Sequence, residues 1–172
     1  MNPLPDETVL VGAAREGNRA AFGRLYELYS RMVHGILLSR VPHGEVDDLM
    51  QDVFLAAMRR LHTLREPGAF GGWLAMIARN RAIDYHRGLF DVAELRPNTA
   101  TQAALLPEAI AVMEAIQSLP DAYRETLTLR LVEGMTGPEI AERTALAPDS
   151  VRVNLHRGMK LLRAKLTGEA AK

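Results

Sequence analysis

The chain has 172 residues, of which 48% are hydrophobic, and its 21 basic residues balance 21 acidic ones. The absence of Cys excludes a disulfide framework and a cysteine-ligated zinc finger. No apolar run approaches the roughly 20 residues that span a bilayer, and residues 1–10 lack the basic start and apolar core of a signal peptide. We therefore expect one large or two small folded domains, located in the cytoplasm.

Apolar residues recur at helical spacing along the first half of the chain, which predicts an all-α fold. Pro67 and the pair Gly71-Gly72 predict a loop over residues 64–72. The expected helices of this half cover 8–17, 18–40, 47–61 and 73–87. The inward face of the second is marked by Phe22, Leu25, Tyr26, Tyr29, Val33, Ile36 and Leu37.

A break in this pattern divides the chain in two. Gly88, Pro97 and Pro107 punctuate residues 88–107, and the apolar periodicity lapses there. The sequence therefore predicts two small helical domains joined by a flexible linker. The boundaries are 8–88 for the first domain, 89–107 for the linker and 108–168 for the second domain.

The second domain is predicted to contain four helices, over 108–118, 121–133, 136–144 and 148–166, and to end in a helix-turn-helix. Thr136 and Glu139 fit a capping box, and Pro148 restarts a helix at its first position. The last helix has an apolar stripe and a basic remainder, because residues 147–166 hold five Lys or Arg against one acid. The N-terminal end of such a helix can enter a major groove while its basic side chains meet phosphate. The stripe consists of Val151, Leu155, Met159, Leu162 and Leu166.

Charge alternates along the chain although its total is zero. Residues 45–55 hold four acids and no base, whereas residues 56–90 hold six Arg against two acids. Residues 91–121 are again acidic, with five acids against one Arg. This alternation favours separate surfaces for separate partners.

The acidic helix over 47–61 carries the first candidate site. Asp48 and Asp52 are four residues apart and share one face, with Gln51 beside them. The helix dipole favours acids in a first turn, which explains part of this cluster without a function. Carboxylates also suit Mg²⁺ or Mn²⁺, but no second cluster at ligand spacing completes such a site. We therefore expect a protein-docking surface, and no metal or other cofactor.

The second candidate site lies in the segment 70–87. Its apolar side includes Trp73, which we expect to lie mostly in the core. Its polar side carries Arg79, Asn80, Arg81 and Arg87 toward the C-terminal half. These arginines are either solvated and paired along the helix, or they grip single-stranded DNA together with Asn80 and the glycine loop.

These constellations occur in an order that resembles the extracytoplasmic-function group of bacterial sigma factors, part of the sigma-70 family. The stretch EVDDLMQDVFLAAMRRL is similar to the acidic conserved helix of that family, and FGGWLAMIARNRAIDYHRG to its promoter-melting helix. Residues 119–166 resemble the C-terminal domain of the family. The resemblance implies a protein that binds core RNA polymerase, directs it to specific promoters and helps to open DNA.

The resemblance also implies roles for particular residues. The clamp helices of the largest polymerase subunit would be bound by Asp47, Asp48, Gln51 and Asp52. Promoter DNA at the −10 element would be bound by Arg65, Phe70, Arg79, Asn80, Arg81 and Arg87. The −35 element would be bound by Asp149, Ser150, Arg152, Val153, His156, Arg157 and Lys160. An anti-sigma factor, often bound to the membrane, is a further implied partner, whereas a small-molecule substrate is not.

Two other classes of protein fit the sequence less completely. A helix-turn-helix repressor or activator with a helical sensing domain explains residues 119–166 equally well, but it leaves the acidic helix and the glycine-rich segment unexplained. Such a regulator binds a palindromic duplex on its own, usually as a dimer. An enzyme is disfavoured, because no nucleophile–base set, phosphate-binding loop or two-histidine metal motif is present.

Overall fold

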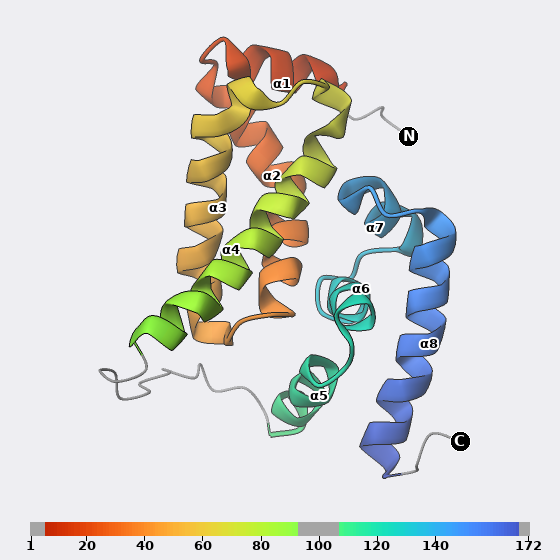
Figure 1. Cartoon of the computed structure of the whole chain (residues 1–172). Coiled ribbons are helices and arrows are strands. Elements are labelled where there is room, and N and C mark those ends of the chain that lie inside the picture. Colours follow the sequence, from red (N-terminus) through yellow and green to blue (C-terminus); the bar gives the residue numbers. More distant parts are fainter. Residues whose placement is uncertain (1–5, 93–106, 169–172) are drawn as a thin grey trace.

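The computed structural model describes residues 6–92 and 107–168, and every long element in these ranges is an α-helix (Figure 1). The prediction of an all-α fold is therefore confirmed. Short 3₁₀ turns connect some of the helices, as at His43–Glu45 and Pro67–Ala69. The helices are α1 (Glu7–Arg15), α2 (Arg19–Leu38), α3 (Val46–Arg60), α4 (Phe70–Val92), α5 (Pro107–Gln117), α6 (Asp121–Leu131), α7 (Gly137–Thr144) and α8 (Pro148–Thr167).

The N-terminal helices form one packed body. Helices α2, α3 and α4 lie side by side, and α1 crosses one end of them (Figure 1). Asp6 caps α1 and Asn18 caps α2, each accepting a hydrogen bond from a backbone N–H of the first turn at 3.1 Å. The core side chains without solvent exposure include Leu25, Ile36, Leu37, Phe70 and Leu74.

One residue of the expected inward face of α2 lies elsewhere. Tyr26 is 40% exposed, and its ring packs on the ring of Phe54 in α3 with centroids 4.5 Å apart. The prediction that Tyr26 points inward is therefore wrong. Helical spacing places Tyr26 at the edge of the apolar face, where an amphipathic ring can cover a neighbour and keep its hydroxyl in water.

Helix α4 is longer than predicted at both ends. It begins at Phe70, so Gly71 and Gly72 occupy its first turn and the predicted loop over 64–72 ends earlier. It also continues through Gly88 to Val92, because one exposed glycine costs a helix only about 1 kcal/mol. The remainder of the predicted linker, residues 93–106, lies outside the described residues.

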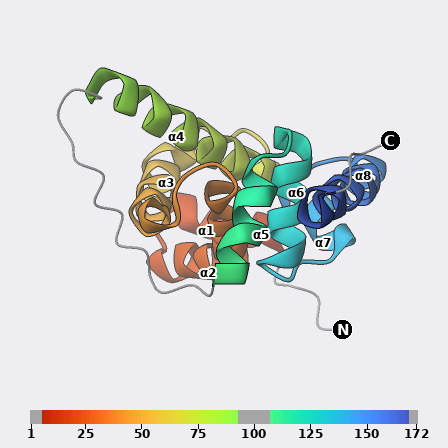
Figure 2. The same ribbon diagram turned by 90° about the horizontal axis from the view of Figure 1, so that it is seen from below.

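Helices α5 to α8 pack against the N-terminal body. Helices α5 and α6 lie between that body and α8 (Figure 2). The apolar core is continuous, because Leu129 of α6, Ile140 of α7 and Val151 of α8 are buried in the same cluster as the side chains of α2 and α4. A second, smaller cluster joins α5, α6 and α8 through Ile116, Leu119, Leu127 and Leu162. Among the described residues, no helix is both long enough and apolar enough to cross a membrane.

Candidate nucleic-acid interface

Helices α7 and α8 form the expected helix-turn-helix. The Thr136 backbone N–H donates to the Glu139 carboxylate at 2.7 Å, and the Glu139 N–H donates to the Thr136 hydroxyl at 3.3 Å, which confirms the capping box. Pro148 opens α8 as predicted. The turn between the helices depends on Ala145, whose φ of 58° is left-handed and unusual for a residue other than glycine.

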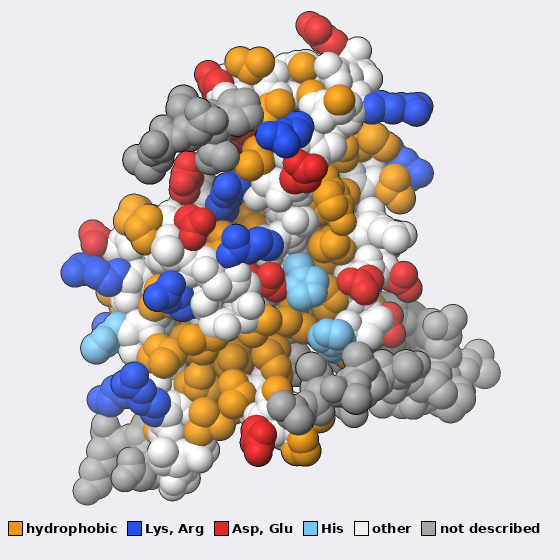
Figure 3. Space-filling model, turned by 180° about the vertical axis from the view of Figure 1, so that it is seen from behind, with side chains coloured by type: hydrophobic (Ala, Val, Ile, Leu, Met, Phe, Trp, Pro, Cys, Tyr) orange, Lys and Arg blue, Asp and Glu red, His pale blue; other side chains and the backbone are white. Residues whose placement is uncertain are grey.

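The polar face of α8 is free to meet a ligand. In Figure 3 the edge where α8 lies, at the left of that view, carries Lys and Arg side chains. Arg152 pairs with Asp149 at 3.2 Å, but both side chains are more than three-quarters exposed, so this pair holds neither of them firmly. The residues predicted to bind the −35 element are all exposed: Asp149, Ser150, Arg152, Val153, His156, Arg157 and Lys160.

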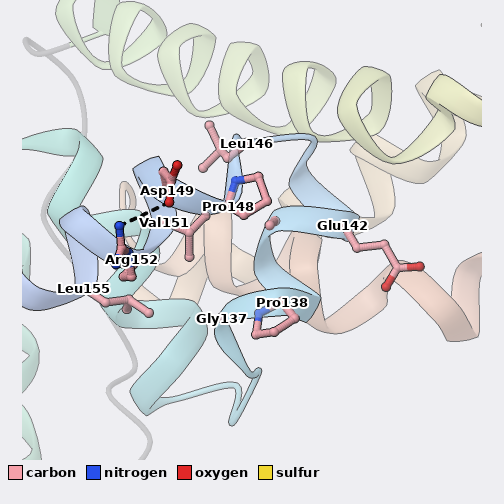
Figure 4. A pocket seen from close by; sticks show the side chains of 10 residues that line it. Gly137, Pro138, Glu142, Leu146, Pro148, Asp149, Val151, Arg152 and Leu155 are labelled. Carbon is pink, nitrogen blue, oxygen red and sulfur yellow. Dashed lines mark hydrogen bonds and ion pairs between the residues drawn. The ribbon is translucent and has the colours of Figure 1, made fainter.

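An apolar pocket of about 610 Å³ lies between α7 and α8 (Figure 4). Pro138, Leu146, Val151 and Leu155 contribute to its lining, together with the paired Asp149 and Arg152. The polar atoms that line it are few, so the pocket offers shape and apolar contact rather than acid–base chemistry. Across the described ranges, no three His, Asp or Glu side chains gather as metal ligands.

The acidic face of α3 is exposed at three of its four predicted residues. Asp47, Asp48 and Gln51 face solvent. Asp52 is half-buried, and it accepts a hydrogen bond from Arg81 of α4 at 2.9 Å. Arg81 thus pairs across two helices instead of along its own helix.

The residues predicted to bind the −10 element differ in exposure, and Arg79 and Arg81 are half-buried and paired with acids. Arg65, Asn80 and Arg87 are exposed. Phe70 has no solvent exposure, and its ring packs against Tyr29 with centroids 5.2 Å apart. Phe70 therefore cannot contact DNA in this structure, and it serves as a core residue at the start of α4.

Arg79 is held by a buried acid of the C-terminal half, which comprises α5 to α8. Its guanidinium donates to both carboxylate oxygens of Glu125 in α6, at 2.6 and 3.0 Å. Arg40, which follows α2, pairs with the same carboxylate at 2.9 Å. The hydrogen bonds to Glu125 raise the pKa of Arg79, whereas burial lowers the pKa of Arg40. Arg40 and Glu125 lie 85 positions apart, so no local pattern in the sequence marks them as partners.

Further polar contacts join the halves. His34 of α2 pairs with the carboxylate of Glu133, just after α6. Arg143 of α7 donates to the Leu28 carbonyl at 2.7 Å and lies 5.1 Å from the centre of the Tyr29 ring. Burial is the main reason that the pKa of Tyr29 is raised far above its ordinary value.

Comparison with known proteins places the chain in a family. The model of Sigma-70 region 2 matches residues 25–89, and that of Sigma-70 region 4 matches residues 109–162. The RNA polymerase sigma factor CarQ of Myxococcus xanthus is 34% identical over 165 residues, covering 90% of this chain and 94% of CarQ. The chain belongs to the sigma-70 family, in its extracytoplasmic-function group.

Other sigma factors agree in length and fold. The RNA polymerase sigma factor CnrH of Cupriavidus metallidurans is 29% identical, with both chains fully covered. A solved structure of CnrH in complex with the cytosolic domain of CnrY superposes with a TM-score of 0.66, at 26% identity, over 95% of this chain and 99% of that one. In this sigma factor, the region 2 match lies within α2 to α4, and the region 4 match runs from α5 into α8.

Proposed function

We propose that this sigma factor binds core RNA polymerase, directs it to specific promoters and helps to open promoter DNA. The observation that carries this proposal is the presence of both region 2 and region 4 matches on one chain. The exposed acidic face of α3 and the exposed basic face of α8 supply two separate contact surfaces. The role is one of binding, without catalysis by the sigma factor itself.

The polymerase contact is assigned to the acidic face of α3. Asp47, Asp48 and Gln51 are exposed there, and Asp52 lies at the edge of the same face. Such a face suits a basic partner surface, which we assign to the clamp helices of the largest polymerase subunit. Electrostatic complementarity of this kind raises the rate of association and fixes the orientation of docking.

DNA is assigned to two helices. The −35 element is bound as duplex by the N-terminal half of α8, whose base-reading candidates are Arg152, Val153, His156 and Arg157. The −10 element is bound by α4 and the turn before it, where Arg65, Asn80 and Arg87 are already exposed. Arg79 and Arg81 join them once their acidic partners are displaced.

An anti-sigma factor is the regulatory partner that we propose. The solved CnrH chain is in a complex with the cytosolic domain of CnrY. Figure 3 shows hydrophobic side chains gathered low on the face seen there, an apolar surface of the kind that protein partners cover. We place the sigma factor in the cytoplasm, where an anti-sigma factor at the membrane is able to hold it.

The proposal is tested by run-off transcription with purified bacterial core polymerase, this protein and a promoter-containing genomic library. Specific transcripts that require the protein are the expected result. Tight binding of the protein alone to duplex sites, without such transcripts, would instead support the helix-turn-helix regulator. Co-purification with core polymerase provides the control for a library that lacks a suitable promoter.

A further inference from the structure

The most buried acid described in the structure is shared by two arginines of the other half. Glu125 of α6 is only 4% exposed. Its Oε2 atom lies 2.9 Å from Arg40 Nη2, and its Oε1 atom lies 2.6 Å from Arg79 Nη2. Arg40 and Arg79 belong to the N-terminal body, so this carboxylate bridges the two halves.

This cluster has a surplus of positive charge. Arg40 is influenced by Glu125 and Asp121, which favour its charge, and by Arg79 and Arg124, which oppose it. Counting Arg40 itself, three cations and two acids act on this site, and one of the cations, Arg124, lies on α6 and pairs with Asp121. Both acids come from α6, so withdrawal of α6 leaves Arg40 and Arg79 together without either of them.

A buried cluster of this type is a weak device for stability, because removing charges from water offsets much of their attraction. Such a cluster can, however, exchange one anion for another at the same arginines. The planar guanidinium of Arg binds a phosphate in the same two-pronged manner as it binds a carboxylate. The Glu125 carboxylate therefore occupies a place that a DNA phosphate fits.

Helices α6 and α7 are seated on glycines of the N-terminal body. A Cβ atom built on Gly35 of α2 would lie 2.6 Å from the Leu129 side chain, and one built on Gly72 of α4 would lie 2.8 Å from the Ala145 Cβ. Distances this short do not occur between real side chains. The Ala145 Cβ atom cannot rotate away, so a larger residue at Gly72 acts as a wedge between the halves.

The seated arrangement does not suit simultaneous binding of two promoter elements. A compact chain of this length has a radius of gyration of about 16 Å and a diameter of about 40 Å. Elements centred at −35 and −10 are about 25 base pairs apart, which is about 85 Å of duplex at 3.4 Å per base pair. Binding to both elements therefore requires that α6 leave Arg40 and Arg79.

We propose that Arg40 and Arg79 form a phosphate-binding pair for promoter DNA, and that the Glu125 carboxylate occupies this pair as an internal competitor in the free protein. The proposal rests on the function proposed above. It adds Arg40, which follows α2, to the DNA contacts. It also makes α6 a lid over part of the −10 surface.

The test measures binding of the full-length protein, without polymerase, to a short fluorescein-labelled single-stranded DNA by anisotropy. Glu125→Ala removes the competitor, and we expect about tenfold tighter binding from the freed charge-assisted hydrogen bonds. Two additional phosphate contacts steepen the dependence of log K on log salt by about 1.4, at roughly 0.7 for each contact with a single strand. Adding Arg40→Ala to Glu125→Ala should abolish most of the gain. Glu114→Ala, an exposed site on α5, is the control of equal charge.

A second variant keeps every charge in place. Gly72→Leu drives a side chain against Ala145 and should open the lid, raising DNA affinity in a manner that again requires Arg40. Gly23→Leu is the matched control, because a Cβ atom at Gly23 meets nothing within 4 Å. Since the chain has no native Cys, fluorophores attached through Glu16→Cys and Thr167→Cys report whether the halves separate. Gly72→Leu therefore still tests the proposal if Glu125→Ala fails to fold.

The outcomes separate this inference from the proposed function. Unchanged DNA affinity in Gly72→Leu and in folded Glu125→Ala overturns the inference, whether the fluorophores report opening or closure. A gain in affinity that persists after Arg40→Ala also overturns it. If the wild-type protein supports promoter-specific transcription in either case, the proposed function stands. A wild-type protein that neither binds polymerase nor drives transcription contradicts the proposed function itself.

Discussion

Asn80 differs from its two neighbours in α4. Arg79 is paired with Glu125 and Arg81 with Asp52, whereas Asn80 is exposed. Its amide both donates and accepts, so it suits an unpaired base better than a phosphate. We expect Asn80→Ala to weaken promoter opening by about 1 kcal/mol, the typical contribution of one hydrogen bond, with a smaller effect on initial binding. Permanganate footprinting measures opening and electrophoretic mobility measures binding. Met76→Ala, at an exposed site on α4, is the control; equal losses in opening and binding would contradict the role of Asn80.

Arg157 is an exposed cation on the face of α8 that we assign to the −35 element. If its guanidinium reads a base, Arg157→Ala weakens promoter binding by about 1–3 kcal/mol and relaxes the preference at one position. Binding of the polymerase complex to a set of singly substituted −35 sequences measures both effects. Arg24→Ala removes another exposed cation, from α2, and should leave the preference unchanged. Uniform weakening over all sequences would show that Arg157 contacts phosphate instead.

The structural roles of some residues follow from their immediate sequence neighbours, whereas the roles of others do not. The capping box of Thr136 and Glu139 lies within four positions, so its geometry follows from the sequence. The left-handed Ala145 gave no such signal, because glycine and asparagine are the usual residues at that conformation. The pairing of Arg79 with Glu125 depends on two segments that meet only in the folded chain.

Helix α3 presents the acidic face that we assign to polymerase. Asp48→Arg combined with Gln51→Arg neutralises the face of Asp47, Asp48, Gln51 and Asp52 and places two cations on it, without breaking the Asp52–Arg81 pair. We expect binding to core polymerase to fall by at least about 100-fold, because like charges brought together at an interface cost several kcal/mol. Co-purification and fluorescence titration measure the loss, and circular dichroism checks that the variant remains helical. Glu16→Arg with Glu27→Gln, at two exposed sites in the same half, shifts the total charge by the same amount and is the control; an equal loss there would make the effect one of total charge alone.

The spacing of apolar residues predicted most of the helices, but it predicted their ends less accurately. The predicted start of α4 at residue 73 is three residues late, because Gly71 and Gly72 read as a loop signal. Their actual role is close approach, since α7 ends directly against them. A single sequence does not show whether a glycine is present because a turn requires it or because another helix packs closely against it.

The sequence alone did not predict that the two halves pack on each other. Charge alternation pointed to separate surfaces, but it did not indicate that Glu125 of α6 and Glu133 just after α6 would pair with basic side chains of the N-terminal body. The residues responsible, Glu125 and Glu133, are separated from their partners by 46 to 99 positions. Only the three-dimensional arrangement brings these charges together, and it shows part of the predicted −10 surface in use as a contact between halves.

The pair of His34 and Glu133 makes this packing sensitive to pH. The groups acting on His34 are Glu133 from the C-terminal half and Asp47 from α3, with Arg31 close by on the Glu133 carbonyl. The hydrogen bond to Glu133 is the main cause that raises the pKa of His34, and burial opposes it only in part. The ordinary pKa of histidine is about 6.5. A raised pKa means that the protonated imidazole is the form that binds Glu133 and holds the halves together.

The sign of the effect follows from linkage. A group whose pKa is raised on folding contributes its full stabilisation below its unfolded pKa of about 6.5, and this contribution is lost as pH rises through the higher folded value. We therefore expect the halves to separate more readily at pH 8.5 than at pH 6, by up to about 1 kcal/mol for a partly exposed pair. Fluorophores on the two halves measure this opening in a denaturant titration at each pH. His34→Gln keeps a hydrogen-bond donor but cannot titrate, so it should flatten the pH dependence, whereas His62→Gln, at an exposed site, should not. If His34→Gln retains the wild-type slope, another group governs the closure, and the His34–Glu133 pair contributes only its contact.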